Sequence, residues 1–174
     1  MKKLLIVVDY QNDFVSGSLG FEKAKELDKL IYNRIKEYKE NNDQVIFTFD
    51  THYENYMDTV EGKHLPVKHC LKGSDGHKLY GKVATLFDEH DISFEKTTFP
   101  SLELAKYLEN KEYQSVELCG LVSNICVLSN VIMVRSALPN VEIYVDKNLT
   151  MSFDEQMNEY FLKILEGLHI NVIG

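Results

Sequence analysis

A carboxylate, a lysine and a thiol each follow a short apolar run of the sequence. Asp9 follows the first such run, Lys96 the third and Cys126 the fourth. A thiol acts as a nucleophile when a base takes its proton, and a lysine beside a carboxylate and a thiol can hold the thiol as thiolate. If the fold brings them together, these three side chains have the chemistry of covalent catalysis.

Each of the three also has an ordinary structural interpretation. Asp9 could be a turn or helix-capping aspartate, and Lys96 a solvated surface lysine. Cys126 could be a buried structural cysteine, which is the interpretation we favour for Cys119 in the middle of an apolar run. Cys126 differs because it follows a glycine turn at the start of a helix pattern, where the helix dipole favours a thiolate and backbone N–H groups can bind an oxyanion. Position alone leaves both interpretations open.

Histidines and carboxylates gather after the second apolar run. They are the ligand types that Zn(II), Fe(II) and Mn(II) accept, and they comprise Asp50, His52, Asp58, Glu61, His64 and His69. Asp50 and His52 are two residues apart, so an extended or turning backbone can aim both at one ion. Surface loops also carry histidines without a metal, and the spacing alone leaves a metal site and a solvated loop both open.

Strand-like and helix-like segments alternate along the chain and would position these residues. Short runs rich in β-branched residues predict six strands at Leu4–Val8, Val45–Phe49, Ile92–Phe94, Val116–Leu118, Val141–Val145 and Ile170–Ile173. Apolar spacings of three and four predict helices over residues 24–38 and 102–108, and further helical segments cover residues 125–137 and 154–165. The alternation predicts an α/β fold: three layers, α/β/α, doubly wound around a six-stranded, mainly parallel sheet. Such sheets bind ligands at the carboxyl ends of their strands.

The stretch from Thr51 to Lys82 interrupts this alternation. It is polar, rich in histidine, glycine and charge, and shows no clear helix or strand period. A loop of this length inside a compact domain is usually functional or disordered. The chain has no linker, repeat or low-complexity tract. We therefore expect one domain over residues 1–174, with a metal-binding loop at about residues 50–82.

The composition of the chain argues against nucleic acid and membranes as binding partners. Nineteen basic and 27 acidic residues give a net charge of -8, which repels nucleic acid and anionic lipid. No apolar run approaches the roughly 20 residues of a membrane span. The three cysteines lack the spacing of a disulfide framework and suit free thiols in a reducing compartment. We expect a cytoplasmic protein that acts on a small neutral or cationic molecule, without nucleic acid or membrane as a partner.

Taken together, these residues resemble the cysteine hydrolase superfamily that contains nicotinamidases, isochorismatase-like hydrolases and N-carbamoyl amidohydrolases. An opening D-x-Q-N-D-F motif is present at Asp9–Phe14, the lysine after the third strand is Lys96, and a G-x-x-[ST]-[ND]-x-C-V turn covers Gly120–Val127. The likeness covers nearly the whole chain and is nearest to nicotinamidase. The order of the three features makes their combination specific.

The resemblance implies an isochorismatase-like fold and a role for each residue of the triad. Cys126 would be the nucleophile and Asp9 the proton acceptor and donor, while Lys96 would hold the pair charged and oriented. It also implies a cis peptide bond between Leu121 and Val122. The backbone amides of Val122 and Cys126 would be the oxyanion donors.

The resemblance further implies one divalent transition metal, with Zn(II) as the first choice and Fe(II) or Mn(II) as alternatives. The implied ligands are Asp50, His52, Glu61 and His69. Members of the superfamily differ in the third ligand, so the position of Asp58 is an alternative to that of Glu61, and His64 is a fallback. Phe14 and Phe99 are expected to form walls for a flat ring, although aromatic residues in these positions could equally belong to the core.

The activity implied by the resemblance is hydrolysis of a small carboxamide through a cysteine thioester, with nicotinamide converted to nicotinate and ammonia as the first candidate. Two alternatives stay open. One is another small-amide, carbamoyl or ureido hydrolase of the same superfamily. The other is a catalytically idle relative that binds a small ligand. An assembly of identical chains is also left open, because folds of this kind often pair.

Overall fold

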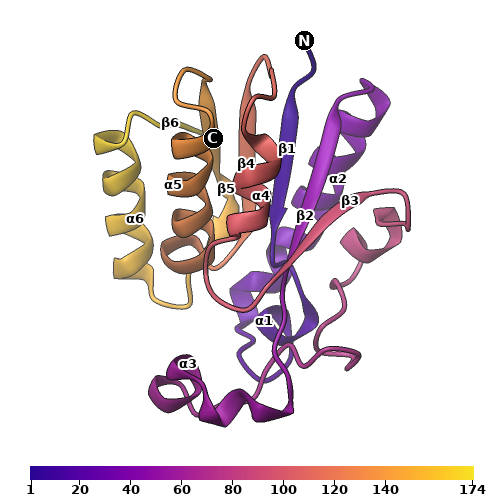
Figure 1. The fold of residues 1–174 in the computed structure, drawn as a ribbon, viewed down its shortest axis with the longest axis vertical. Coiled ribbons are helices and arrows are strands. Elements are labelled where there is room, and N and C mark those ends of the chain that lie inside the picture. The colour runs from indigo at the N-terminus through magenta and orange to yellow at the C-terminus, as the bar shows by residue number, and fades with distance from the viewer.

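The computed structural model describes residues 1–174 and contains six strands and six α-helices (Figure 1). The strands are β1 (Leu4–Val8), β2 (Gln44–Asp50), β3 (Ile92–Lys96), β4 (Val116–Leu121), β5 (Ile143–Met151) and β6 (Asn171–Ile173). The α-helices are α1 (Asn12–Val15), α2 (Leu27–Glu40), α3 (Val60–His64), α4 (Leu102–Leu108), α5 (Leu128–Ala137) and α6 (Glu155–Gly167). Short 3-10 helices cover Glu22–Glu26, Glu54–Asp58 and Val83–Leu86, and a π-helical turn covers Ser123–Val127.

The six strands form one sheet in the order β3-β2-β1-β4-β5-β6, and every pairing is parallel. All five residues of β1 are buried because this strand is apolar on both faces. The chain winds from β1 towards β3 on one side and from β4 towards β6 on the other. The point where the strand order reverses therefore lies between β1 and β4, and ligand crevices of doubly wound sheets open at such a point. Asp9 follows β1 and Cys126 follows β4.

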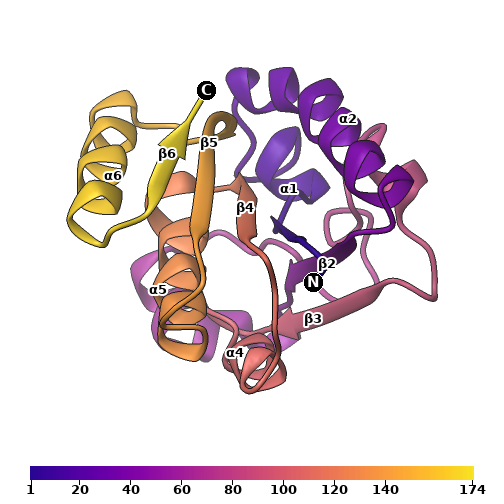
Figure 2. The ribbon, with the colours of Figure 1, turned by 90° about the horizontal axis from the view of Figure 1, so that it is seen from above.

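Helices cover both faces of the sheet, so the predicted three-layer α/β/α fold is confirmed. Figure 2 shows α1 and α2 on one side and α4, α5 and α6 on the other. Ile31 and Ile35 of α2 belong to the core on the first side, and Val131 of α5 and Phe161 of α6 belong to the core on the second. None of the helices combines the length and apolar character that a membrane crossing requires.

Several segments differ from the sequence prediction, and the fifth strand and the segment after the second strand differ most. The fifth strand extends to Met151, well beyond the predicted end at Val145, because its pairing with β4 shifts register at a bulge and exposed Lys147 and Asn148 interrupt the apolar pattern. Two short helices, Glu54–Asp58 and α3, occur in the segment that shows no period. Each has five residues, which is too few for a helical period to be read from sequence.

Gly120 occupies a position in β4 that has no room for a side chain. Its φ is 109°, and a Cβ atom would lie 2.0 Å from the carbonyl oxygen of Val8 in β1. Because the obstacle is backbone, no rotamer change relieves it. We expect Gly120→Ala to lower the free energy of unfolding by more than about 2 kcal/mol, measured by urea denaturation.

Gly167 at the end of α6 provides the matched control for this substitution. A Cβ atom there meets nothing within 4 Å. Gly167→Ala should therefore leave stability unchanged or raise it by up to about 1 kcal/mol, because alanine is the better helix former. Equal losses of stability in the two variants would contradict this account of β4.

Candidate active site

The side chains of Asp9, Lys96 and Cys126 meet at the carboxyl end of the sheet. The Nζ atom of Lys96 lies 2.6 Å from Oδ2 of Asp9 and 3.7 Å from Sγ of Cys126. Asp9 is 0% exposed, and Lys96 and Cys126 are each 5% exposed. The fold therefore brings a carboxylate, an amine and a thiol into contact in a place that is almost free of solvent.

Asp9 is positioned by a sharp turn and by the neighbouring strand. Its φ of 45° lies in the left-handed region, which aspartate tolerates better than most residues, and this turn ends β1. The hydroxyl of Thr48 in β2 donates a hydrogen bond of 2.7 Å to Oδ1 of Asp9. That bond fixes one carboxylate oxygen and directs the other, Oδ2, towards Lys96.

Burial and charge together set the protonation of the three groups. Burial raises the pKa of the Cys126 thiol well above its ordinary value, although Lys96 acts to lower it. Burial also raises the pKa of Asp9, again opposed by Lys96. Burial acts to lower the pKa of Lys96, but the charges of Asp9 and Cys126 outweigh it and the pKa is raised. Lys96 is therefore a cation that contacts both the carboxylate of Asp9 and the neutral thiol of Cys126, and Asp9 is the carboxylate beside them that can accept the thiol proton.

Cys126 lies in the π-helical turn after β4, whereas the sequence predicted the first turn of an α-helix. The amides of Ile125 and Val127 both donate to the carbonyl of Val122, at 3.0 and 3.2 Å, and so hold Cys126 between them. Single-turn π-helices are frequent at functional sites. The peptide bond between Leu121 and Val122 is cis, as the resemblance implied.

Four candidate metal ligands converge beside the triad. One ligand atom from each of Asp50, His52, Glu61 and His69 lies within 4.8 Å of all the others. Nε2 of His52 is 2.9 Å from Oδ2 of Asp50 and 3.6 Å from Oε1 of Glu61, and Nε2 of His69 is 3.3 and 3.5 Å from the same two atoms. Tetrahedral zinc ligands at bond lengths of about 2.0–2.2 Å lie roughly 3.3–3.6 Å apart. The distances of 3.6, 3.3 and 3.5 Å match this spacing, whereas the 2.9 Å between His52 and Asp50 is shorter.

Unpaired atoms in the cluster also fit a cation. Nε2 of His52 makes no aligned hydrogen bond although it lies 2.9 Å from Oδ2 of Asp50, and Oε2 of Glu61 is buried without a hydrogen-bond partner, whereas buried polar atoms normally have one. Nδ1 of His69 is 2.8 Å from the carbonyl oxygen of Val67, which leaves Nε2 directed into the cluster, an arrangement common in metal-binding histidines. Asp58 and His64 are exposed and do not belong to the cluster.

One pocket of about 380 Å³ joins the triad to the cluster. Its lining includes Cys126 together with Asp50, Glu61 and His69. Phe14 and Phe99, the two predicted ring walls, both line it; Phe14 is buried, whereas Phe99 is 42% exposed. Val122, singled out above for its backbone amide, also lines the pocket. The lining residues that the sequence analysis did not name are Leu19, Gly20, Leu65, Ile125 and Phe153.

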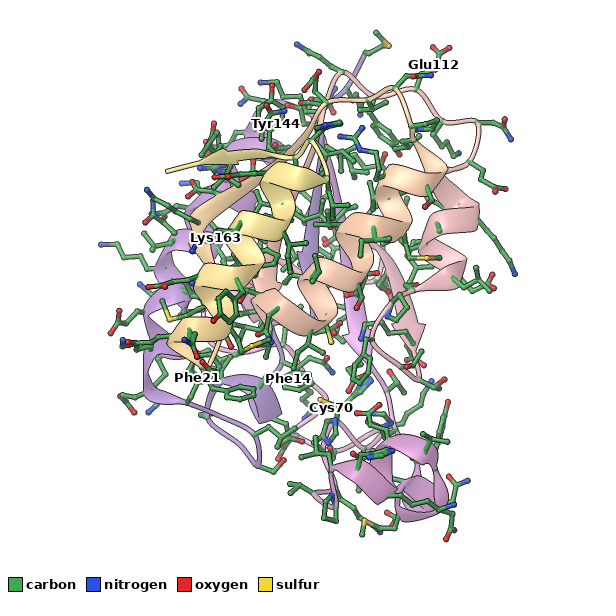
Figure 3. All side chains as sticks on the ribbon, turned by 90° about the vertical axis from the view of Figure 1, so that its left-hand side faces the viewer. Phe14, Phe21, Cys70, Glu112, Tyr144 and Lys163 are labelled. Carbon is green, nitrogen blue, oxygen red and sulfur yellow. The ribbon has the colours of Figure 1, made fainter.

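Phe14 is the one lining residue that Figure 3 labels, and it lies in the lower half of that view, far from Glu112 and Tyr144 at the upper end. The ring of Phe14 is 5.6 Å from that of His69, so the wall of the pocket contacts a candidate ligand directly. Phe153, which packs edge-on against Phe21, follows the end of β5. The rule that ligands bind at strand ends would have identified Phe153 if the end of β5 had been predicted correctly.

Comparison with known proteins gives consistent matches. The family model of the isochorismatase domain matches residues 3–173. The isochorismatase family protein PncA of Bacillus subtilis (strain 168) is 31% identical, over 93% of each chain. The nicotinamidase of Saccharomyces cerevisiae is 26% identical, over 98% of this chain and 99% of its own. The crystal structure of nicotinamidase PncA from Bacillus subtilis superimposes with a TM-score of 0.89 and 27% identity, over the whole of both chains.

Proposed function

The chain belongs to the isochorismatase family of hydrolases, and we propose that residues 1–174 act as one cysteine amidohydrolase domain that converts nicotinamide to nicotinate and ammonia. One observation carries the proposal: a single pocket of about 380 Å³ is lined by the thiol of Cys126, by three residues of the metal cluster and by two aromatic walls. A pocket of this size suits a small ring. Nicotinamide offers a carboxamide for the thiol and a ring nitrogen for the metal cluster.

Cys126 and Asp9 perform the covalent steps. Asp9 accepts the thiol proton, and the resulting thiolate forms a bond to the carboxamide carbon. The C–N bond then breaks, and the proton held by Asp9 leaves with ammonia. Asp9 then accepts a proton from water as the water oxygen bonds to the thioester carbon; the C–S bond breaks, Asp9 gives the proton to the sulfur, and nicotinate leaves. Lys96 stays charged throughout and keeps Asp9 oriented through the 2.6 Å ion pair.

The backbone after β4 stabilises the negative charge of the tetrahedral intermediate. The amides of Val122 and Cys126 act as the oxyanion donors, because both belong to the turn that presents the thiol to the pocket. Phe14 and Phe99 hold the flat ring between them. These contacts place the carboxamide carbon against Sγ of Cys126.

Asp50, His52, Glu61 and His69 would hold one divalent metal ion, with Zn(II) favoured by the spacing and by the mixed nitrogen and oxygen ligands. The same ligand types also accept Fe(II) and Mn(II). When bound, the ion supplies a Lewis-acidic position for a heteroaromatic nitrogen. The carboxylates of Asp50 and Glu61 balance the charge of the dication, so the cluster needs no further ionised residue.

The pocket predicts a preference for neutral amides over anionic ones. No lysine or arginine lines it, while Asp50 and Glu61 do. A carboxylate such as that of N-carbamoylglycine would find no lysine or arginine in the lining and would lie near the carboxylates of Asp50 and Glu61, which disfavour it. We expect kcat/KM for nicotinamide to exceed that for N-carbamoylglycine by at least about 100-fold, equivalent to roughly 3 kcal/mol. The measurement is ammonia release from each compound by the same zinc-loaded preparation.

Benzamide is the matched control substrate, because it has the shape of nicotinamide without the ring nitrogen. It should be hydrolysed more slowly than nicotinamide if the nitrogen is recognised at the metal cluster. Faster release of ammonia from N-carbamoylglycine than from nicotinamide would replace the proposal with a carbamoyl hydrolase. No release from any of the three would leave the chain as a ligand-binding relative.

The pH dependence of kcat/KM follows from the state of Asp9. Asp9 must be ionised to accept a proton, so activity falls as the pH falls through its pKa. Burial raises this pKa above the ordinary 3.8, against the opposing effect of Lys96, and the acidic limb should therefore lie above pH 3.8. Zinc content is measured at each pH, so that a fall in activity caused by protonation of Asp9 can be distinguished from one caused by loss of zinc. A fully metal-loaded enzyme whose limb lies at or below pH 3.8 would contradict the assignment.

A further inference from the structure

The hydrogen-bond ladder between β1 and β2 stops just before the metal cluster. Its last paired residues are Val8 and Thr48, because Asp9 turns the chain away with a φ of 45°. Asp50 lies two residues further along β2, beyond the reach of the β1 ladder, and is 3% exposed. A buried residue at this place needs new partners for its backbone N–H and C=O.

The side chain of Gln11 supplies those partners. Its Oε1 accepts a hydrogen bond of 2.8 Å from the N–H of Asp50, and its Nε2 donates one of 2.9 Å to the C=O of the same residue. Nε2 also donates to the carbonyl of His77, at 2.8 Å. Gln11 is 0% exposed, and these three bonds are all the hydrogen bonds of its side chain. The amide thus replaces the missing peptide group of the neighbouring strand.

Asp50 is the residue that links the two halves of the site. Its Oδ2 lies 2.9 Å from Nε2 of His52 in the metal cluster, and its Oδ1 lies 3.4 Å from Nζ of Lys96 in the triad. The direction of this carboxylate depends on where the backbone of Asp50 is held. On the other edge of β2, the N–H of Thr51 donates to the carbonyl of Lys96, at 2.8 Å. Gln11 therefore holds the backbone of Asp50 on the edge of β2 where the pairing with β1 has ended.

We propose that Gln11 is a positioning residue that sets the carboxylate of Asp50 for metal binding by pairing with the backbone of Asp50. The inference rests on the metal cluster of the proposed function. It assigns separate tasks within the D-x-Q-N-D-F motif: Asp9 accepts the proton, and Gln11 holds a metal ligand. Groups that orient metal ligands in this way typically change metal affinity by about 10–100-fold when they are replaced.

Two substitutions of Gln11 test this role. Gln11→Glu keeps the shape but places a carboxylate oxygen against the carbonyls of Asp50 and His77, which only a donor can satisfy. Gln11→Met keeps the approximate volume and removes all three hydrogen bonds without adding charge. Asn12→Asp is the matched control, because it makes the same amide-to-acid change one residue later, where the side chain donates only to the carbonyl of Asp75 in an exposed bond.

The experiment measures the Zn(II) affinity of the full chain by competition with a chromogenic chelator, together with urea unfolding of the metal-free protein. We expect the Zn(II) affinity to fall about 10–100-fold in Gln11→Glu and by a smaller factor in Gln11→Met, and to stay near the wild-type value in Asn12→Asp. A role confined to folding would instead lower the stability of the metal-free protein and leave the affinity of the folded protein unchanged. If Gln11→Glu does not fold, the Zn(II) affinity of Gln11→Met tests the role of Gln11.

Each outcome separates this inference from the proposed function. Wild-type protein that binds zinc and releases ammonia, with Gln11 variants that bind zinc as tightly as Asn12→Asp, would overturn the role of Gln11 and leave the hydrolase intact. Wild-type protein that binds no stoichiometric zinc would overturn both the metal cluster and the role of Gln11. Weaker zinc binding in the Gln11 variants alone would support the inference whatever the substrate proves to be.

Discussion

Replacing Cys126 with alanine is expected to lower kcat/KM for nicotinamide by at least about 10⁴-fold, the range seen when a catalytic nucleophile is removed. Sγ is the only thiol in the pocket lining, so no other side chain there can form the thioester. The substitution removes one atom from a residue that makes no ion pair. Folding and zinc content should therefore stay at wild-type levels, which circular dichroism and elemental analysis would show alongside ammonia release.

Cys119 provides the control for this experiment. It is also a buried thiol, but it lies in β4 within the core on the side of α2 and does not line the pocket. Cys119→Ala should lose some stability through the small cavity it leaves and keep its activity. Similar losses of activity in Cys119→Ala and Cys126→Ala would mean that Cys126 acts through packing rather than as the nucleophile.

Asp9→Asn is expected to lower kcat/KM by about 10²–10⁴-fold, the usual contribution of a positioned general base. Asparagine has the same shape but cannot accept the thiol proton, and burial keeps the Cys126 thiol neutral by raising its pKa. The effect should not add to that of Cys126→Ala, because both residues serve the same step. Ammonia release from the two single variants and the double variant measures this.

The same substitution also removes the partner of a buried cation. Lys96 loses its 2.6 Å ion pair, and breaking a buried pair of this kind typically costs about 3–5 kcal/mol of stability. Asp9→Asn combined with Lys96→Met removes both charges and should recover much of that stability without recovering activity. Recovery of activity in this double variant, or near-normal activity in Asp9→Asn, would show that another group accepts the proton.

The sequence predicted the meeting of Asp9, Lys96 and Cys126 because of where their strands end. The first strand has the predicted bounds, Leu4–Val8, since an apolar run closed by an aspartate leaves little freedom in its assignment. In a parallel sheet all strand ends lie along one edge, so residues far apart in sequence become neighbours there. Contact distances and protonation states could not be derived in this way, because they depend on burial from several elements.

The third candidate metal ligand could not be decided from spacing. Asp58, Glu61 and His64 all lie within one short segment, and local turns place only Glu61 of the three in the cluster with Asp50, His52 and His69. The hydroxyl of Thr59 accepts the N–H of Gly62 and starts α3 there. Gly62 itself packs so closely that a Cβ atom would lie 2.1 Å from the carbonyl oxygen of Tyr56. Such turns carry no periodic signal.

The hydrogen bonds of Gln11 to Asp50 could not be predicted from the sequence for a related reason. The motif singled out the residue, but its partner Asp50 is 39 positions away, and its hydrogen bonds to Asp50 use backbone atoms, which every residue possesses. No pattern of side-chain types can reveal such a contact. The role of Phe153 could not be predicted for a comparable reason. The bulge extends β5 beyond the apolar run, so the true end of this strand, next to Phe153, could not be recognised in the sequence.

Trapping the acyl intermediate tests the central claim most directly. Zinc-loaded wild-type protein is incubated with nicotinamide and increasing hydroxylamine, and ammonia, nicotinate and the hydroxamate are quantified, with Cys126→Ala as the control. If a thioester forms on Cys126, hydroxylamine competes with water for it, so hydroxamate should rise at the expense of nicotinate. Ammonia release with nicotinate as the sole product at every hydroxylamine concentration would contradict the account and indicate direct attack by water.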